Sequence, residues 1–186
     1  MSVLSLQNIC FSYGKNTVLN DISYEFEKGK MYCIIGKSGA GKTTLLSLLS
    51  GLAAPNSGEI IYDGKNIAKI DKYTFRSKYI GVVFQSFNLI TKYTALENVI
   101  LSMDVAGYKT KNMKARALSY DPDIILADEP TGNLDQETQK EIMEIFRELA
   151  NQGKCVILVS HSPEVAAMCD ERYELTRIQG KKKKNN

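Results

Sequence analysis

The 186-residue sequence lacks the features that mark membrane-spanning, secreted or disulfide-rich proteins. No apolar run approaches the roughly 18 residues that a membrane span needs, and the N-terminus shows no signal-peptide pattern. The four cysteines form no C-x-x-C pair, and most of them lie inside apolar runs, which favours buried free thiols in a reducing cytosol. We therefore expect a soluble protein inside the cell that reaches a membrane only through a partner.

A surplus of basic charge is also missing from the body of the chain. The formal net charge is +3, but the run Lys181–Lys184 alone supplies four positive charges. Without that run, basic and acidic side chains nearly balance, whereas a nucleic-acid-binding domain needs a basic face. We expect no nucleic-acid partner. We expect residues 181–186 to be a disordered tail in solvent, with weak contact to anionic lipid as the alternative.

Apolar segments typical of buried strands alternate with segments of helical periodicity, without repeats or low-complexity linkers. The expected strands are Val3–Phe11, Ile22–Phe26, Met31–Ile35, Gly58–Asp63, Ile80–Phe84, Ile124–Ala127 and Val156–Val159. The expected helices are Lys42–Ser50, Ala95–Ala106 and Gln136–Ala150. This alternation predicts a single α/β domain with a mainly parallel sheet flanked by helices.

The sharpest motif follows the expected strand Met31–Ile35 and opens the next helix. It matches the pattern G-x-x-x-x-G-K-[ST] with Gly36, Lys37, Ser38, Gly39, Ala40, Gly41, Lys42 and Thr43. Glycines let backbone N–H groups curl around an anion, and the helix N-terminus adds its dipole. Lys42 can reach the outer phosphates and the Thr43 hydroxyl can ligate Mg²⁺. An ordinary glycine-rich turn is the alternative, but this context predicts binding of a nucleoside triphosphate.

Two adjacent carboxylates end another expected buried strand. Asp128 is placed to hold Mg²⁺ through water, and Glu129 directly after it can orient or deprotonate an attacking water. A solvated turn is the alternative. His161, the only histidine of the chain, follows the strand Val156–Val159 at the same expected edge of the sheet. A lone histidine is often structural, but ligands bind at this edge of parallel sheets, which favours a functional role.

With these motifs the chain resembles the ATP-binding subunits of ABC transporters over nearly its whole length. Within them it is similar to the macrolide-export and lipoprotein-release branch, which includes antimicrobial-peptide exporters. The motifs that carry the resemblance are YG at Tyr13, GKSGAGKTT from Gly36, GVVFQSFNL from Gly81, LADEPTGNLD from Leu126 and VSH at Val159. The resemblance implies a P-loop NTPase fold with an antiparallel N-terminal β subdomain, and it assigns residues 1–180 to one ATP-binding domain.

The resemblance also implies roles for single residues. Tyr13 would stack on adenine, although a packing role is as good an interpretation of Tyr13 alone. Gln85 would contact Mg²⁺ or the attacking water and carry the nucleotide state to a permease. The segment Gly36–Thr44, Thr44 included, would hold the phosphates of Mg-ATP. Asp128 would bind Mg²⁺, Glu129 would be the general base, and His161 would touch the γ-phosphate. The segment Asn133–Asp135 would face a second ATP-binding subunit.

One part of the family pattern is missing. In the family, a helical subdomain that ends in the signature LSGGQ separates the glutamine loop from the Asp-Glu strand, and a helix ending in ARAL follows the signature. Here Ala115–Leu118 retains ARAL, but the signature occurs nowhere in the sequence. We therefore expect a truncated helical subdomain, with several dozen residues lost and the join near residues 108–114.

Because the signature is missing, the sequence does not decide whether this chain hydrolyses ATP. In the family, two subunits sandwich ATP head to tail, and each signature contacts the γ-phosphate bound to the opposite subunit. A homodimer of this chain should therefore hydrolyse ATP near the background rate, whereas binding should suffer less. One alternative is a non-hydrolysing nucleotide-binding module that regulates or is inert. A P-loop kinase is a second alternative, but the Asp128-Glu129 pair and His161 favour the ABC interpretation.

Overall fold

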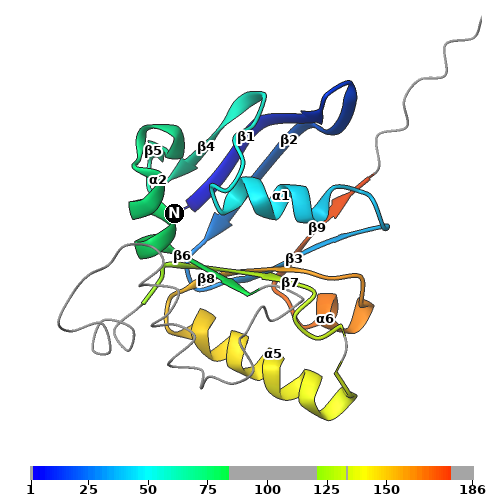
Figure 1. Cartoon of the computed structure of the whole chain (residues 1–186). Coiled ribbons are helices and arrows are strands. Elements are labelled where there is room, and N and C mark those ends of the chain that lie inside the picture. The colour runs from blue at the N-terminus through cyan, green and yellow to red at the C-terminus, as the bar shows by residue number, and fades with distance from the viewer. Residues whose placement is uncertain (1, 84–120, 133, 177–186) are drawn as a thin grey trace, which may run out of the picture.

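Two β-sheets and the helices around them make up the fold. The computed structural model describes residues 2–83, 121–132 and 134–176. In this part of the chain, an antiparallel four-stranded sheet lies over one face of a parallel five-stranded sheet, and the helix α1 (Lys42–Leu49) lies between them (Figure 1). The helices α5 (Gln136–Asn151) and α6 (Pro163–Ala167) cover the opposite face of the parallel sheet (Figure 1).

The antiparallel sheet has the strand order β2-β1-β4-β5. Its members are β1 (Ser2–Tyr13), β2 (Asn16–Glu27), β4 (Ser57–Tyr62) and β5 (Lys65–Asn66). Strands β1 and β2 form a long hairpin that runs from the pair Ser2 and Glu27 to the pair Tyr13 and Asn16. Tyr13 therefore stands at the end of β1, next to the hairpin turn.

The parallel sheet has the strand order β6-β7-β8-β3-β9. Its members are β3 (Met31–Gly36), β6 (Ile80–Val83), β7 (Ile124–Asp128), β8 (Cys155–Val159) and β9 (Glu171–Leu175). Every pairing between these strands is parallel. Because carboxyl ends of parallel strands share one edge, the chain leaves β3, β7 and β8 at the same side of the molecule.

Alternate residues of the parallel strands pack into two separate hydrophobic clusters. Ile34, Leu126 and Ile157 face α1 and the antiparallel sheet, and they share one cluster with Leu4 of β1. The other faces of the same strands pack against buried side chains of α5 and α6. A strand has a side-chain period of two, so a strand buried on both faces appears as a continuous apolar run. This explains why the sequence predicts these strands well.

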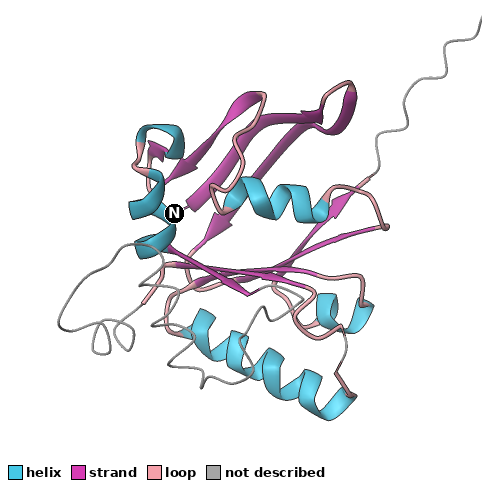
Figure 2. Cartoon of the chain, in the orientation of Figure 1, coloured by secondary structure: helices cyan, strands magenta, loops and turns pink. Residues whose placement is uncertain are grey.

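The path from β5 to β6 consists of short helical turns (Figure 2). These are the 3₁₀ turn Ile67–Lys69, the α-helical turn α2 (Lys72–Thr74) and a π-helical turn at Phe75–Tyr79. Asp71 caps α2, because its carboxylate accepts a hydrogen bond of 2.8 Å from the Thr74 backbone N–H.

The expected strands and helices within the described residues are confirmed, with ends shifted by a few residues. The hairpin is longer than expected, and the helix expected at Gln136–Ala150 extends to Asn151. The sequence does not predict the short strand β5, the turns between residues 67 and 79, the helix α6 or the edge strand β9. The helix expected at Ala95–Ala106, the join near residues 108–114 and the lysine-rich tail lie outside the described residues. Within them, no helix is long and apolar enough to cross a bilayer.

Candidate nucleotide-binding site

The phosphate-binding motif forms a loop between the end of β3 at Gly36 and the start of α1 at Lys42. Gly41, just before the helix, has a φ of 98°, and a Cβ placed there would lie 2.8 Å from Cγ1 of Val18. Both the positive φ and the close approach of β2 require glycine at this position. The loop is therefore held against the antiparallel sheet, with the N-terminus of α1 open to a ligand.

A cavity of about 310 Å³ lies over this loop. Its lining comes from β2, the loop, the first turn of α1 and the end of β7, namely Val18, Ser38, Gly39, Gly41, Lys42, Thr43, Thr44, Asp128 and Glu129. The structure thus brings most residues of the predicted phosphate site to one cavity, together with both predicted carboxylates. Ala40 is buried beneath the loop, and its N–H donates to the Lys37 carbonyl at 3.0 Å.

The Lys42 ammonium group is held by the loop itself. Nζ of Lys42 donates to the carbonyl oxygen of Gly36 at 2.8 Å and to that of Lys37 at 3.4 Å. These contacts place a positive charge at the mouth of β3, beside the backbone N–H groups at the start of α1. An anion at this position would meet both a charged donor and backbone donors.

Thr43 and Asp128, the two predicted magnesium ligands in the described residues, are in direct contact. The Thr43 hydroxyl donates to Oδ2 of Asp128 at 3.1 Å. Burial raises the pKa of Asp128 above its usual value, and the charge of Glu129 adds to the rise, although Thr43 and Lys42 oppose it. The protein therefore holds a carboxylate here at an energetic cost, which is typical of functional sites.

These residues fit Mg²⁺. A hydroxyl and a carboxylate oxygen are hard ligands, and Mg²⁺ usually binds one or two protein oxygens and completes its shell with water and substrate phosphates. Among the described residues, no three His, Cys, Asp or Glu side chains gather into a site made only of protein ligands. Mg²⁺ bound by Thr43 and Asp128 would neutralise phosphate charge.

Glu129 is held in an unusual conformation at the end of β7. Its φ is 46°, in the left-handed region that non-glycine residues seldom occupy, and its N–H donates to the Val159 carbonyl at 2.9 Å. The side chain is only 12% exposed. Such strain often occurs at functional sites, where the surrounding structure holds the residue in place.

His161 pairs with the Glu129 carboxylate. Nδ1 of His161 lies 2.9 Å from Oε1 of Glu129, while the imidazole remains 72% exposed. With Nδ1 turned to the carboxylate, Nε2 is the ring nitrogen left for another partner. The geometry thus connects two residues that come from separate sequence motifs at the same edge of the sheet.

Tyr13 does not line the cavity over the loop. Its ring is 61% exposed and packs edge-on against Phe11, with centroids 4.9 Å apart. An exposed ring face at the end of β1 is compatible with stacking on a base and has little packing role of its own. Gln85 and Asn133 lie outside the described residues. Asp135 caps α5, where its carboxylate accepts from the Thr138 N–H at 3.0 Å.

The sequence alone does not single out two residues of the site. Val18 forms the apolar side of the cavity, and Ser160 contacts the Glu129 carboxylate. Val18 looks like any strand residue, and its role depends on the close approach of β2 to Gly41. Ser160 stands between the strand β8 and His161, so its place in the VSH motif was the available signal.

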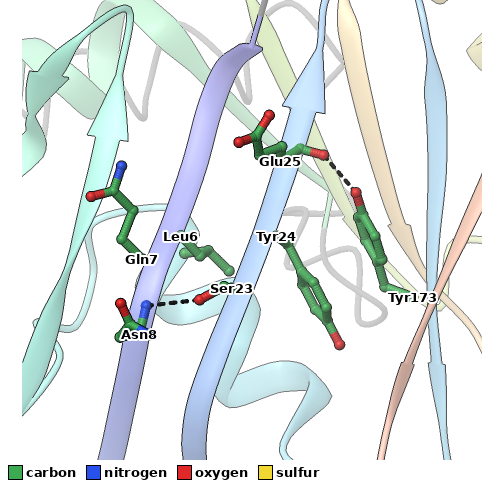
Figure 3. A pocket seen from close by; sticks show the side chains of 7 residues that line it. All are labelled: Leu6, Gln7, Asn8, Ser23, Tyr24, Glu25 and Tyr173. Atoms are coloured by element: carbon green, nitrogen blue, oxygen red, sulfur yellow. Dashed lines mark hydrogen bonds between the residues drawn. The ribbon is translucent and has the colours of Figure 1, made fainter.

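A second cavity, of about 410 Å³, lies where β2 approaches β9 (Figure 3). The Tyr24 and Tyr173 rings stack there with centroids 4.1 Å apart, and the Tyr173 hydroxyl donates to the Glu25 carbonyl at 2.7 Å. The cavity shares no residue with the phosphate loop and contains no motif residue. Its polar contacts connect the two sheets, so we assign it a structural role.

Comparisons with known proteins agree with this geometry at the level of the fold. The chain superposes on the dimeric ABC transporter cassette MJ0796 with a TM-score of 0.79 and 28% identity, covering 95% of this chain and 99% of that one. A second structure of the same cassette, bound to ADP and phosphate, gives a TM-score of 0.80 over 95% of this chain and 97% of that one. The fold is that of a P-loop NTPase of the ABC cassette class.

Sequence comparison defines the family. The ABC transporter family model matches residues 19–115. The ABC transporter ATP-binding protein YclH of Bacillus subtilis is 39% identical and covers 95% of each chain. The lipoprotein-releasing system protein LolD of Protochlamydia amoebophila is 35% identical, covering 85% of this chain and 86% of that protein. MacB of Campylobacter jejuni, a macrolide export protein, is 34% identical over 93% of this chain and 33% of that protein. The chain belongs to the ATP-binding family of ABC transporters.

Proposed function

We propose that this chain binds Mg-ATP in the cavity over the phosphate loop as the ATP-binding subunit of an exporter. The single observation that carries the proposal is the convergence of Lys42, Thr43, Asp128, Glu129 and His161 at one sheet edge. Lys42 and the loop N–H groups would hold the phosphates, and Thr43 and Asp128 would hold Mg²⁺. Tyr13 would stack on adenine.

Glu129 would act as the general base toward the attacking water, with His161 contacting the γ-phosphate through Nε2. Gln85, which follows the strand β6 in the sequence, would contact Mg²⁺ or the same water and report the nucleotide state to a permease. Stacking suits adenine recognition because a ring face carries no directional bond, and each stacked base contributes about 1–3 kcal/mol in proteins that bind single-stranded nucleic acids. These assignments rest on the motif positions and on the contacts described above.

Because the signature is missing, a pair of subunits that includes this chain can have only one complete ATP site. We call this site, formed by this chain's phosphate loop and a partner's signature, the half-site. Removing one transition-state donor typically costs about 10²–10³ in rate, and a charged group supplied by a partner contributes about 10³–10⁵. We propose that this chain alone hydrolyses ATP near background, while its own site is completed by a partner subunit that carries a signature. The alignment with YclH supports a deletion, because it spans 214 positions and this chain has only 186 residues.

The partners follow from the family. We propose a transmembrane permease and a second ATP-binding subunit, with the chain in the cytoplasm at the inner face of the membrane. The helical subdomain also docks the permease in this family, so the truncation near residues 108–114 would weaken coupling to transport. The near balance of charge outside the tail supports protein partners and no nucleic acid.

The test mixes this chain with a full-length ATP-binding subunit that carries an intact signature but a disabled catalytic glutamate. The site formed by this chain's phosphate loop and the partner's signature is then the only complete one. We expect phosphate release above the sum of the two separate proteins. That release should vanish with Glu129→Gln in this chain, because the base would be lost.

Glu141→Gln, an exposed glutamate on α5, is the matched control and should leave the release unchanged. If the mixture stays at background while ATP binding and pairing of the subunits are both measured, the half-site is inactive. A non-hydrolysing nucleotide-binding module would then be the correct function.

A further inference from the structure

Ser160, directly after β8, is a buried polar residue that the family motifs leave without a role. Its exposed fraction is 1%. Its hydroxyl donates to Oε2 of Glu129 at 3.3 Å and accepts the Ser162 backbone N–H at 3.1 Å. The hydroxyl therefore makes two hydrogen bonds, one to the Glu129 carboxylate and one to the loop that leads into α6.

The direction of the Ser160 proton is fixed by this arrangement. A serine hydroxyl has one proton to donate and lone pairs to accept. Ser162 donates to the oxygen, so the proton remains for an acceptor, and Oε2 of Glu129 is the acceptor that the structure provides. Hydrogen bonds to a charged group are about twice as strong as neutral ones, so this contact holds the ionised carboxylate.

Ser160 also connects the general base to the strand that leads into the phosphate loop. Its own backbone N–H donates to the Ile34 carbonyl of β3 at 3.3 Å, two residues before Gly36. Ser160, which is almost completely buried, therefore links the Glu129 carboxylate to β3 through two hydrogen bonds. A rigid link of this kind sets the distance between a base on β7 and phosphates bound by the loop after β3.

The two oxygens of Glu129 are used differently. Oε2 accepts from the Ser160 hydroxyl at 3.3 Å and from the His161 backbone N–H at 3.4 Å. Within the described part of the chain, the hydrogen-bond partner of Oε1 is Nδ1 of His161 at 2.9 Å. Each carboxylate oxygen can accept about two hydrogen bonds. Oε2 is therefore filled, and Oε1 keeps a lone pair for a water molecule.

From this geometry we infer that Ser160 is a positioning residue that turns the Glu129 carboxylate so that Oε1 is the oxygen presented to the attacking water. The inference rests on the proposed role of Glu129 as the base and adds the residue that orients it. Because Ser160 does not line the cavity over the phosphate loop, it should affect the chemical step and leave nucleotide binding unchanged.

The first arm of the test needs no nucleotide and no hydrolysis. His161 is the only histidine, so its imidazole C–H signals are unambiguous in a proton NMR spectrum of the full chain. Ser160→Ala should shift these signals, because the carboxylate that holds Nδ1 turns when its second anchor is lost. Ser160→Thr, which keeps the hydroxyl, should give the parent spectrum. Ser162→Ala is the matched control, since its hydroxyl caps α6 and does not touch Glu129.

A double-mutant cycle separates positioning from a general structural effect. On a Glu129→Ala background, Ser160→Ala should leave the histidine signals where they are, because Ser160 acts through the carboxylate. An equal shift on both backgrounds, or no shift on either, would overturn the inference. If Ser160→Ala does not fold, Ser160→Cys takes its place in the cycle, since a thiol is a weak donor of similar size.

The second arm uses the mixed dimer with a signature-bearing partner. Ser160→Ala should lower kcat by about tenfold to a hundredfold, as expected for a lost hydrogen bond to a charged group, with KM for ATP unchanged. Ser160→Thr should restore kcat, and a rise of KM alone would contradict the inference. If the parent mixture itself shows no hydrolysis, the proposed half-site has failed, and the NMR cycle still decides the role of Ser160.

Discussion

The Thr43 hydroxyl donates to Oδ2 of Asp128 at 3.1 Å, although the two residues lie 85 positions apart in the sequence. Thr43 lies in the first turn of α1 and Asp128 ends β7, so the contact brings the phosphate loop and the acidic strand together. Thr43 and Asp128 are the two residues that would hold Mg²⁺, and their oxygens lie next to each other. The side chains that we propose for Mg²⁺ therefore converge before any ligand is bound.

Asp128→Asn should stabilise the protein and impair its function. Burial and the charge of Glu129 raise the pKa of Asp128, so the ionised carboxylate destabilises the fold above that pKa and the penalty disappears as the pH falls. At pH 7 we expect a higher melting temperature for the variant without nucleotide. The affinity for ATP should lose its dependence on Mg²⁺, as measured by titration with and without the metal. A lower melting temperature would contradict the assignment.

Asp123→Asn, at the other end of β7, should have the opposite effect on stability. Burial raises the pKa of Asp123, but hydrogen bonds from Lys28 at 2.6 Å and from Tyr62 at 2.5 Å outweigh it and leave the pKa lowered. A lowered carboxyl pKa contributes stability above the unfolded-state pKa, and this is lost as the pH falls. Because Asp123 is partly exposed, we expect a loss of about 1 kcal/mol at pH 7.

The pH dependence of the stability difference between Asp123→Asn and the parent tests whether the charge of Asp123 explains the effect. Denaturant unfolding of the parent and the variant at a series of pH values should show a difference at pH 7 that shrinks once the parent carboxyl is protonated. A difference that stays constant over this range would mean that packing and not charge explains the effect. ATP affinity should be unchanged, since Asp123 lies at the opposite end of β7 from Asp128.

The contrast between Asp123 and Asp128 shows what the sequence could predict. Asp128 was found because it follows a buried strand beside a phosphate motif, and sheet topology alone brings such residues to one edge. The partners of Asp123 come from a turn and from another sheet, and no local pattern connects them. The sequence does not predict the strand β9 for a similar reason, because three of its five side chains are charged and it lies at the edge of the sheet beside β3. Contacts that depend on tertiary packing, such as that of Ser160 with Glu129, leave no periodic pattern in the sequence from which they could be predicted.

Lys42→Ala should weaken ATP binding by at least tenfold, because we propose the ammonium group at the end of β3 as the charged donor for the outer phosphates. The loss of its two hydrogen bonds to loop carbonyls should change stability little. Isothermal titration with Mg-ATP measures the effect. Lys65→Ala, at an exposed position of β5, controls for the loss of one positive charge. Equal affinities of Lys42→Ala and the parent for Mg-ATP would contradict the proposal that the loop binds the phosphates.

Tyr13→Ala should reduce ATP affinity by roughly fivefold to a hundredfold, the range expected when one base–aromatic stack of about 1–3 kcal/mol is lost. Tyr13→Phe keeps the ring and should bind like the parent. Inorganic triphosphate has no base, so its affinity should be the same in all three proteins. A 61% exposed side chain contributes little to packing, and melting temperatures should agree closely. A parallel loss of triphosphate affinity would indicate a damaged hairpin.

Mg-ATP should raise the temperature of a single cooperative unfolding transition. The antiparallel sheet, α1 and one face of the parallel sheet share a hydrophobic cluster, in which Leu4, Leu45 and Leu126 are fully buried, so neither sheet can unfold alone without exposing the other. A ligand at about one hundred times its Kd adds roughly 2.7 kcal/mol, which corresponds to a rise of about 5–11 °C for a chain of this size. Scanning calorimetry measures this rise, with ATP alone and Mg²⁺ alone as controls. Lys42→Ala should abolish the rise without broadening the transition. A broad transition whose temperature does not change with nucleotide would show that the two sheets do not share one core in solution. The candidate site would then have no rigid support.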